Sequence, residues 1–322
     1  MRKNDRVIRR LKRQVEMLEK AATSLSQDDL LDILDVNADS PIQDLRRILR
    51  AGQLTELSAS HVAKGIIEGK KFKDWLSTDA SAALFIEGSS SSASCGRNTP
   101  MSLMSSVVIE SLHDKEPAIA IYFFCGSHTS SKDSIKGPHG MMRSLICQIL
   151  RLFLVDLDFI SSRRYREQLQ SLNLYTLCDC FGKLVKRLPM DTVLFCIIDS
   201  ICFFEKKEWA ENCRKAVNDL QDLADDDELG AVFKLLITSP SRSRYVGGTL
   251  PSQCRLLLPE DGLNGRDGPT ERQISMRARR PAKVKESDIF RSLRAKSCPD
   301  NGGEESSDFF SESDALSDSD VE

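Results

Sequence analysis

Long apolar runs are missing from this chain of 322 residues. No stretch approaches the roughly 18 consecutive apolar residues that a membrane helix needs, and the most apolar segments, residues 118–125 and 193–198, have only the length of strands. The start of the chain carries charges where a secretory signal has an apolar run. We therefore expect no membrane span and an intracellular protein, in the cytoplasm or, as the alternative, in the nucleus.

Metal and hydrolase signatures are missing too. The ten cysteines are scattered and complete no zinc ligand set, although Cys125 and His128 stand three positions apart. Many lie in apolar surroundings, which is typical of reduced core thiols. The four histidines accompany no nucleophile elbow and no Cys-His signature. Residues 225–228 are acidic but lack the glycine and the spacing of a calcium loop. We expect no metal site and no triad hydrolase.

Charge is segregated at the two ends. Residues 1–13 carry seven basic side chains and one acid, whereas residues 300–322 carry nine acids and no base. Apolar residues at three-four-three spacing predict a short amphipathic helix within residues 6–22. This helix packs on the body of the protein or on a partner; the alternatives are a helix that binds nucleic acid or a membrane surface, or a targeting segment. In another interpretation its basic residues and the Arg277–Arg280 cluster bind nucleic acid or an acidic partner. The basic residues of the helix are Arg6, Arg9, Arg10 and Arg13. The acidic tail could also fold back on these basic segments.

The C-terminal part has little apolar content. Glycine, proline and scattered arginines beyond Gly262 lead into a tract of Ser, Asp and Glu, so we expect residues 262–322 to be a disordered tail, basic and then acidic. Ser311, Ser317 and Ser319 each have an acid three residues later. An acidophilic kinase could use this pattern, and phosphate would add negative charge.

Short apolar strands alternate with helical segments in the middle of the chain. This pattern predicts an α/β domain with a mostly parallel five-stranded sheet flanked by helices. We expect the domain to span residues 54–261, after a helical N-terminal extension at 1–53 that includes a helix start at Ser40 and Pro41. The expected strands are 83–87, 118–125, 193–199, 233–238 and 255–258, with helices including 141–153 and 209–223.

The ordered strand-end motifs carry a family resemblance. A Tyr-Phe-Phe strand at 122–124 is followed by a helix reading Arg-Ser-Leu-Ile-Cys-Gln-Ile-Leu at 143–150, and the apolar strands ending at Asp199 and Thr238 follow in order. Over about residues 54–258 the chain resembles the NACHT-like STAND P-loop NTPases of filamentous fungi. The resemblance implies a P-loop NTPase fold, ATP with Mg²⁺ as ligands and protein partners.

The loop expected to grip phosphate departs from that family. A working loop reads Gly-x-x-x-x-Gly-Lys-Ser/Thr, whereas seven residues separate Gly88 from Gly96, and Arg97 and Asn98 follow. Thr99 is typical of a helix N-cap before Pro100. The candidates for a degenerate nucleotide site are therefore Gly88, Gly96, Arg97 and Thr99; the alternative is a serine-rich loop before a helix.

Other strand ends offer further candidates. Asp199 stands where the family places a carboxylate for Mg²⁺, and Glu205 is the first acid after it. The segment after the next strand resembles the family's sensor, with the polar candidates Thr238, Ser239 and Arg242. The alternative is an ordinary strand end followed by a loop, which would show the same residues.

Our leading hypothesis is a degenerate module that serves as a catalytically silent scaffold or regulatory protein. We assign no cofactor, and expect protein partners. One alternative is a weak ATP-binding and hydrolysing switch, with ATP and Mg²⁺ as its ligands. A second is an electrostatic binder acting through the basic N-terminal helix. No repeat of 20 to 50 residues follows the domain, so the ligand-sensing array common in the family is missing from this sequence.

Overall fold

The computed structural model describes residues 25–54, 57–90, 99–113, 115 and 117–258. The strands are β1 (Ala82–Ser90), β2 (Ala118–Phe124), β3 (Val193–Asp199), β4 (Val232–Ser241) and β5 (Arg255–Leu257). The helices are α2 (Gln27–Leu34), α3 (Ser40–Leu54), α4 (Leu57–Glu68), α5 (Lys70–Ser77), α6 (Pro100–Leu112), α7 (Gly137–Leu152), α8 (Arg163–Gln170), α9 (Leu174–Val185) and α10 (Ala210–Ala224). Short 3-10 helices are η1 (Cys125–Ser127), η2 (Asp158–Ile160), η3 (Ile201–Phe204) and η4 (Ser252–Cys254).

The predicted α/β class is confirmed. All five strands are parallel, in the order β2-β3-β4-β1-β5, and none of the described helices is long and apolar enough to cross a membrane. The predicted basic helix at 6–22, the Arg277–Arg280 cluster and the tail with Ser311, Ser317 and Ser319 lie outside the described residues.

The register brings the ends of three strands level with one another. Asp199 at the end of β3 pairs with Phe124 at the end of β2, and Ile198 pairs with Ile237, the residue before Thr238 of β4. Because the strands are parallel, their carboxyl ends meet at one edge of the sheet, where ligands of such folds usually bind. The sheet topology therefore places Asp199 and Thr238 side by side.

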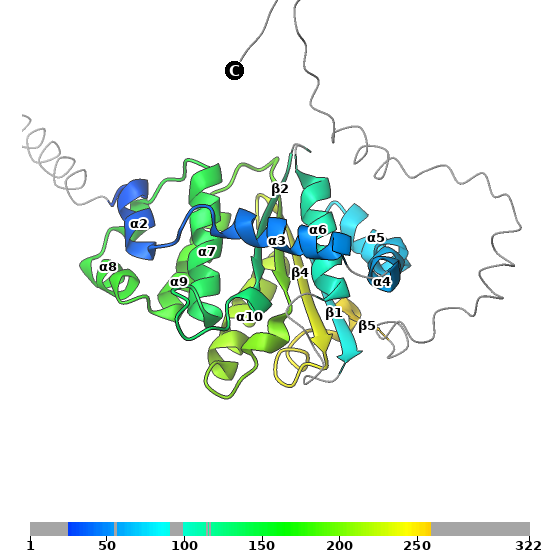
Figure 1. Ribbon diagram of the computed structural model, residues 1–322. Coiled ribbons are helices and arrows are strands. Elements are labelled where there is room, and N and C mark those ends of the chain that lie inside the picture. Colours follow the sequence, from blue (N-terminus) through cyan, green and yellow to red (C-terminus); the bar gives the residue numbers. More distant parts are fainter. Residues whose placement is uncertain (1–24, 55–56, 91–98, 114, 116, 259–322) are drawn as a thin grey trace, which may run out of the picture. The chain divides into compact units, whose positions relative to one another are not determined.

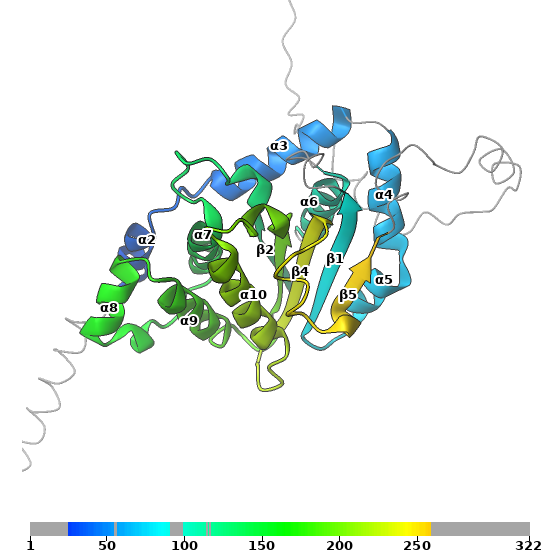
Figure 2. The same cartoon turned by 90° about the horizontal axis from the view of Figure 1, so that it is seen from below.

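Helices cover both faces of the sheet, as Figures 1 and 2 show, with α4, α5 and α6 on one side and α7, α9 and α10 on the other. Successive strand residues point to opposite faces: Leu84 and Ile86 of β1 join the cluster under α5 and α6, whereas Phe85 joins the cluster under α7. Burial on both faces explains why the strands read as continuous apolar runs.

The N-terminal helices belong to this core. Leu30 and Leu34 of α2 are fully buried in the cluster with α7, and Leu45 and Ile48 of α3 are buried with α6. The guanidinium of Arg143 donates to the carbonyl of Leu34 (2.6 Å), and so satisfies a group left without a partner at the end of α2. The domain boundary at 53/54 stays a prediction, while these contacts tie the preceding helices to the sheet.

Gly69 separates α4 from α5. Its backbone is extended (φ −62°, ψ 140°), and it is the N-cap of α5. Glycine is a weak helix former because it loses most backbone entropy in a helix. The break turns Phe72 and Trp75 toward the sheet, where both are buried.

Lys234 of β4 is a buried cation that gives a testable pH dependence. Its ammonium donates to the carbonyl oxygens of Trp75 (3.1 Å) and Thr78 at the end of α5, and burial lowers its pKa to about 8. Between pH 8 and the ordinary lysine pKa near 10.5, the unfolded chain therefore binds more protons at this site than the folded one. Stability contributed by Lys234 should rise with pH across that window.

The measurement is urea unfolding at pH 7.5 and pH 10 for the parent chain, Lys234→Met and the exposed-site control Lys73→Met. We expect the parent and Lys73→Met to gain free energy of unfolding at pH 10 relative to Lys234→Met. Identical pH profiles for the parent and Lys234→Met would contradict the prediction.

Candidate functional site

Asp199 is the centre of the candidate site. An apolar strand carries it to the carboxyl edge of the sheet, and it is 1% exposed there. Its Oδ2 accepts hydrogen bonds from Ser102 Oγ (2.7 Å) and Ser200 Oγ (2.8 Å), and its Oδ1 accepts from Thr238 Oγ1 (2.7 Å), with Ser105 Oγ farther away at 3.4 Å. Hydroxyls from α6, β4 and the residue after β3 thus enclose both carboxylate oxygens.

The Asp199 carboxylate has unusual electrostatics. Burial raises its pKa, and the hydrogen bonds from Ser102, Thr238, Ser200 and Ser105 lower it without overcoming that effect. No lysine or arginine of the described chain forms an ion pair with Asp199. Among the described residues, the groups that surround this carboxyl group are neutral hydroxyls.

Ser200 holds a strained backbone beside this carboxylate. It lies in the left-handed region (φ 59°, ψ 46°), which costs a non-glycine residue about 1–2 kcal/mol. Its N–H donates to Thr238 Oγ1 (2.9 Å), which itself donates to Asp199. Thr238 therefore locks the turn after β3, and such strain concentrates at functional sites.

The start of α6 confirms the predicted N-cap. Thr99 Oγ1 accepts from the N–H of Ser102 (3.0 Å), and Ser102 Oγ accepts from the N–H of Thr99 (3.3 Å), a reciprocal capping box with Pro100 at the first helical position. The hydroxyl of Thr99 is thus used to cap the first turn of α6. The hydroxyl that reaches Asp199 belongs to Ser102, three residues later.

The phosphate-loop candidates are only partly described. Gly88 is buried within β1, while Gly96 and Arg97 lie in residues 91–98, outside the described part. Ser89 Oγ is buried at the end of β1 and has no hydrogen-bond partner in the described structure. A buried hydroxyl without a partner loses free energy, so this atom would gain from an added acceptor.

The three sensor candidates lie in different surroundings. Thr238 joins the Asp199 cluster, as above. Ser239 is buried but its Oγ donates to the carbonyl of Ser241 (2.6 Å) within the same strand, and the Arg242 side chain is exposed. Of the three, the structure brings only Thr238 to Asp199.

Two further buried carboxylates hold the loop after β4. Glu205 Oε1 accepts from the N–H groups of Tyr245 (3.0 Å) and Val246 (2.7 Å), and its Oε2 accepts from that of Arg244 (2.8 Å). Glu87 pairs with Arg255 (2.7 Å) and accepts from the N–H of Ser243 (2.7 Å). Glu205, the first acid after Asp199, is therefore occupied by backbone donors.

Ser102, Ser105, Ser200 and Glu205 are site residues that the sequence did not single out as such. The spacing of Ser102 and Ser105 could have indicated that they act together, because residues three apart on a helix share a face. Glu205 was noticed only as an acid, and its partners come from a loop 38 to 41 residues later.

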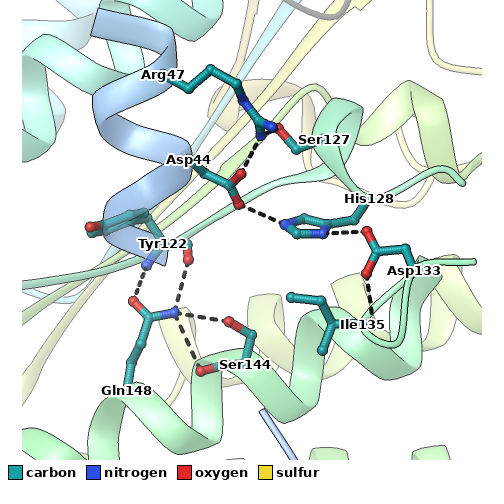
Figure 3. A network of polar contacts seen from close by, with 9 residues as sticks. All are labelled: Asp44, Arg47, Tyr122, Ser127, His128, Asp133, Ile135, Ser144 and Gln148. Atoms are coloured by element: carbon teal, nitrogen blue, oxygen red, sulfur yellow. Dashed lines mark hydrogen bonds and ion pairs between the residues drawn. The ribbon is translucent and has the colours of Figure 1, made fainter. Parts of the chain in front are cut away.

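A second polar cluster surrounds His128, just past β2, and Figure 3 shows it. His128 Nε2 contacts Asp44 Oδ2 of α3 (2.7 Å), and its Nδ1 contacts Asp133 Oδ2 (2.8 Å). Arg47 pairs with Asp44 and donates to Ser127 Oγ (2.7 Å). Because ionised carboxylates only accept hydrogen bonds, both ring nitrogens must carry protons, so His128 is an imidazolium.

The pKa of His128 follows from this geometry. Burial lowers it, but the hydrogen bonds and charges of Asp44 and Asp133 outweigh burial, so the net pKa lies above the ordinary histidine value. The cluster fastens α3 to the loop after β2. It leaves His128 with no ring nitrogen for a metal, and Cys125 beside it is a fully buried thiol whose pKa burial raises.

Metal-binding geometry is not found among the described residues: none of them form a group of three or more His, Cys, Asp or Glu that could hold an ion. Asp226 of the acidic 225–228 run pairs with Lys186 (2.8 Å). Asp199 also fits Mg²⁺ poorly, since both its oxygens already accept from hydroxyls in a buried setting. Within the described residues, the surroundings of Asp199 are hydroxyl groups, and residues 91–98 lie outside them.

Comparison with known proteins gives one family. The family model described as "Nephrocystin 3, N-terminal" matches residues 62–239, more than half of the chain. No curated protein matches the chain. The matched region begins in α4 and ends at Ser239 of β4, so it contains Asp199 and its enclosing hydroxyls.

Proposed function

This chain belongs to the Nephrocystin 3, N-terminal family, a NACHT-associated family, and we propose that its α/β domain is a catalytically silent scaffold or regulatory module. The degenerate phosphate loop and the kinship with fungal STAND proteins are parts of this proposal. So is its place inside the cell, in the cytoplasm or the nucleus. Protein partners are the expected ligands.

The observation that supports a lack of catalytic activity is that hydroxyl groups enclose the Asp199 carboxylate. A carboxylate that helps to hold Mg²⁺ must offer an oxygen to the ion or to its water shell. Both oxygens of Asp199 instead accept short hydrogen bonds from Ser102, Ser200 and Thr238. Glu205, which could have oriented an attacking water, is bound to the N–H groups of the 244–246 segment.

Under this proposal Asp199 has a positioning role. It ties the start of α6 to the ends of β3 and β4, three elements far apart in sequence. A scaffold needs such a fixed edge, because rigid elements present a partner surface without an ordering cost. The same polar residue types that surround a nucleotide in the related enzymes would here support one conformation.

The runner-up is a nucleotide-binding switch, and Ser89 favours it. Its Oγ is buried without a partner at the end of β1, just before the 91–98 segment and the start of α6. A helix start attracts anions, and a phosphate oxygen would give Ser89 an acceptor. The experiment below separates this alternative from the scaffold.

The test is isothermal titration of the full chain with ATP and ADP, with and without Mg²⁺. The full chain is needed because a fragment starting at residue 40 would lose the buried Leu30 and Leu34 of α2. We expect no saturable heat for the parent or for Asp199→Asn at nucleotide concentrations up to about 1 mM, a Kd limit that corresponds to about −4 kcal/mol.

Saturable, Mg²⁺-dependent binding that Asp199→Asn abolishes would overturn the scaffold proposal in favour of the switch. Circular dichroism should show that Asp199→Asn keeps its fold, because the amide preserves the shape of the carboxylate. Thr249→Val, an exposed threonine on the 243–250 loop, serves as the control for changes that leave the Asp199 cluster intact.

A further inference from the structure

A groove lies beside β2, the strand at the edge of the sheet. It has a volume of about 670 Å³ and runs between α3, the end of α6 and α7, a size typical of small-molecule pockets. The small side chains of Ala118 and Ala120 leave room along its floor. Its walls are largely apolar and come from the three helices: Ile42, Leu45, Leu49, Ile109 and Leu152.

Gln148 of α7 shows which chemical group the edge of β2 binds. Its Oε1 accepts from the N–H of Tyr122 (3.0 Å), and its Nε2 donates to the carbonyl of Tyr122 (2.9 Å), as Figure 3 shows. One planar carboxamide therefore satisfies both the outward-facing donor and the outward-facing acceptor of a single strand residue.

Ala120 offers the same donor and acceptor to the groove. Alternate residues of a strand direct their N–H and C=O to the same side, so the backbone of Ala120 faces outward as that of Tyr122 does, and Ala120 lines the groove. Among the described residues, no helix or loop group hydrogen-bonds to the Ala120 backbone. A purely apolar ligand would leave this pair without partners at a cost in free energy, whereas a planar amide would satisfy both groups.

The described rim of the groove carries more positive than negative charge. Arg46 of α3 and Arg151 of α7 line it, against Glu110 of α6. Arg151 also donates to the carbonyl of Val36 (3.1 Å), which fixes its position. Lys115 lines the groove as well, but the acidic residues 114 and 116 beside it lie outside the described part of the chain. The two arginines favour a negatively charged group at the rim.

Arg46 lies close to Tyr122 at one end of the groove. Burial raises the pKa of Tyr122 to about 12, the negative charges of Glu110 and Asp44 add to that effect, and the positive charge of Arg46 opposes it. Such charge effects act over a short range. An anionic group at this end would therefore be attracted by Arg46 and repelled by Glu110.

We propose that this groove binds a small molecule that combines a flat apolar body, a planar amide or lactam edge and a negative charge. The apolar body would cover the walls, since burial of apolar area is the main source of affinity. The amide would pair with the Ala120 backbone as Gln148 pairs with Tyr122, and the charge would lie near Arg46 and Arg151. This site goes beyond the scaffold proposed above and does not rest on it.

The experiment titrates full-length protein into 6-carbamoyl-2-naphthoate and follows the anisotropy of naphthalene fluorescence. Two matched probes each remove one feature. The N,N-dimethylamide keeps the body and the carbonyl but cannot donate, and should bind about 10-fold more weakly because one hydrogen bond is lost. The amide 2-naphthamide lacks the carboxylate and should bind about 3-fold more weakly, as expected for a partly exposed ion pair.

Substitutions locate the site. An edge strand tolerates proline where the N–H faces outward, so Ala120→Pro should weaken binding of 6-carbamoyl-2-naphthoate about 10-fold, while Ala120→Ser, which keeps the N–H, should retain it. Ala118→Leu fills the floor of the groove without removing the Ala120 N–H, and should also abolish binding. Thermal melts should confirm that each variant folds.

Charge variants test the rim. Arg46→Glu should weaken binding of 6-carbamoyl-2-naphthoate and leave that of 2-naphthamide unchanged, and Glu110→Gln should strengthen binding of the carboxylate probe alone. Lys207→Glu, the same charge change as Arg46→Glu at an exposed residue away from the groove, should affect neither probe.

Equal affinities for the primary amide and its dimethyl derivative would overturn the proposal, as would binding that survives both Ala120→Pro and Ala118→Leu. An Arg46→Glu variant that binds both probes like the parent would overturn the assigned charge. None of the probes carries a phosphate, and none of these variants touches Asp199 or its hydroxyl partners. Failure here would therefore leave the nucleotide titration and the scaffold proposal to be decided by their own test.

Discussion

Replacing Gly140 with alanine should lower the free energy of unfolding by about 4 kcal/mol, the range of exceptional single substitutions. Gly140 lies in the first turns of α7, where the backbone of the preceding loop crosses it. A Cβ at this position would lie 1.9 Å from the carbonyl oxygen of Ile135 and 2.0 Å from its carbonyl carbon. Backbone atoms cannot rotate away as a side chain can, so the loop itself would have to move.

The matched control is Gly65→Ala in α4. An added Cβ at Gly65 meets nothing within 4 Å, and alanine favours a helix interior over glycine by about 1 kcal/mol. Urea unfolding should therefore show Gly65→Ala stabilised and Gly140→Ala strongly destabilised. If Gly140→Ala lowered the free energy of unfolding by less than about 1 kcal/mol, the 133–137 loop would be able to move aside at little cost. That result would contradict the prediction.

Replacing His128 with glutamine should cost about 3 kcal/mol at pH 5.5, since removing one partner of a buried ionic cluster leaves the others uncompensated. The carboxylates of Asp44 and Asp133 would then face each other without the imidazolium between them. Phe123 packs its ring on the imidazole, with centroids 4.5 Å apart, so the site is shielded from water on that side.

The pH dependence gives the sharper test. The pKa of His128 is raised in the folded state, so its contribution to stability is complete below the ordinary histidine pKa near 6.5 and is lost as pH rises through the folded value. The difference in free energy of unfolding between the parent and His128→Gln should therefore shrink from pH 5.5 to pH 9. Asp133→Asn should move that loss to lower pH. A difference that grows with pH would contradict the assignment of an imidazolium.

The two substitutions should not be additive. The N–H of Ile135, against which Gly140 packs, donates to Asp133 Oδ1 (2.9 Å), and Asp133 Oδ2 holds His128. Displacing Ile135 would thus draw Asp133 away from the imidazolium. Residues coupled through one loop typically show interaction free energies of about 0.5–3 kcal/mol.

Strands β3 and β4 could be predicted from sequence because they are buried on both faces, and in each an apolar run leads into polar residues. The helices α7 and α10 were predicted as well, at 141–153 and 209–223, because their apolar residues recur at helical spacing. The strand order was beyond such patterns. It depends on which runs pair across more than a hundred residues, and nothing local to β1 identifies β4 and β5 as its neighbours.

The site was predicted in part for the same reason. Asp199 ends β3 and Thr238 lies near the carboxyl end of the adjacent parallel strand β4, so their types and positions indicated a shared edge. Ser102 reaches Asp199 only because of how α6 is rotated against β3, and Glu205 depends on the path of the 243–247 loop. Those relations are tertiary, and the hydroxyl that sequence spacing assigned to the helix start, Thr99, is used by the cap instead.

The position of β1 constrains how the chain can be made. Among the described strands, β1 pairs only with β4 and β5, so residues 82–90 find no partner among them until synthesis has passed residue 232. A nascent or truncated chain ending before β4 would hold β2 and β3 as a pair and leave β1 with both edges bare. Sheet completion is therefore a late event, and any shorter product that stops ahead of Val232 would be a candidate for aggregation and clearance rather than a smaller working domain.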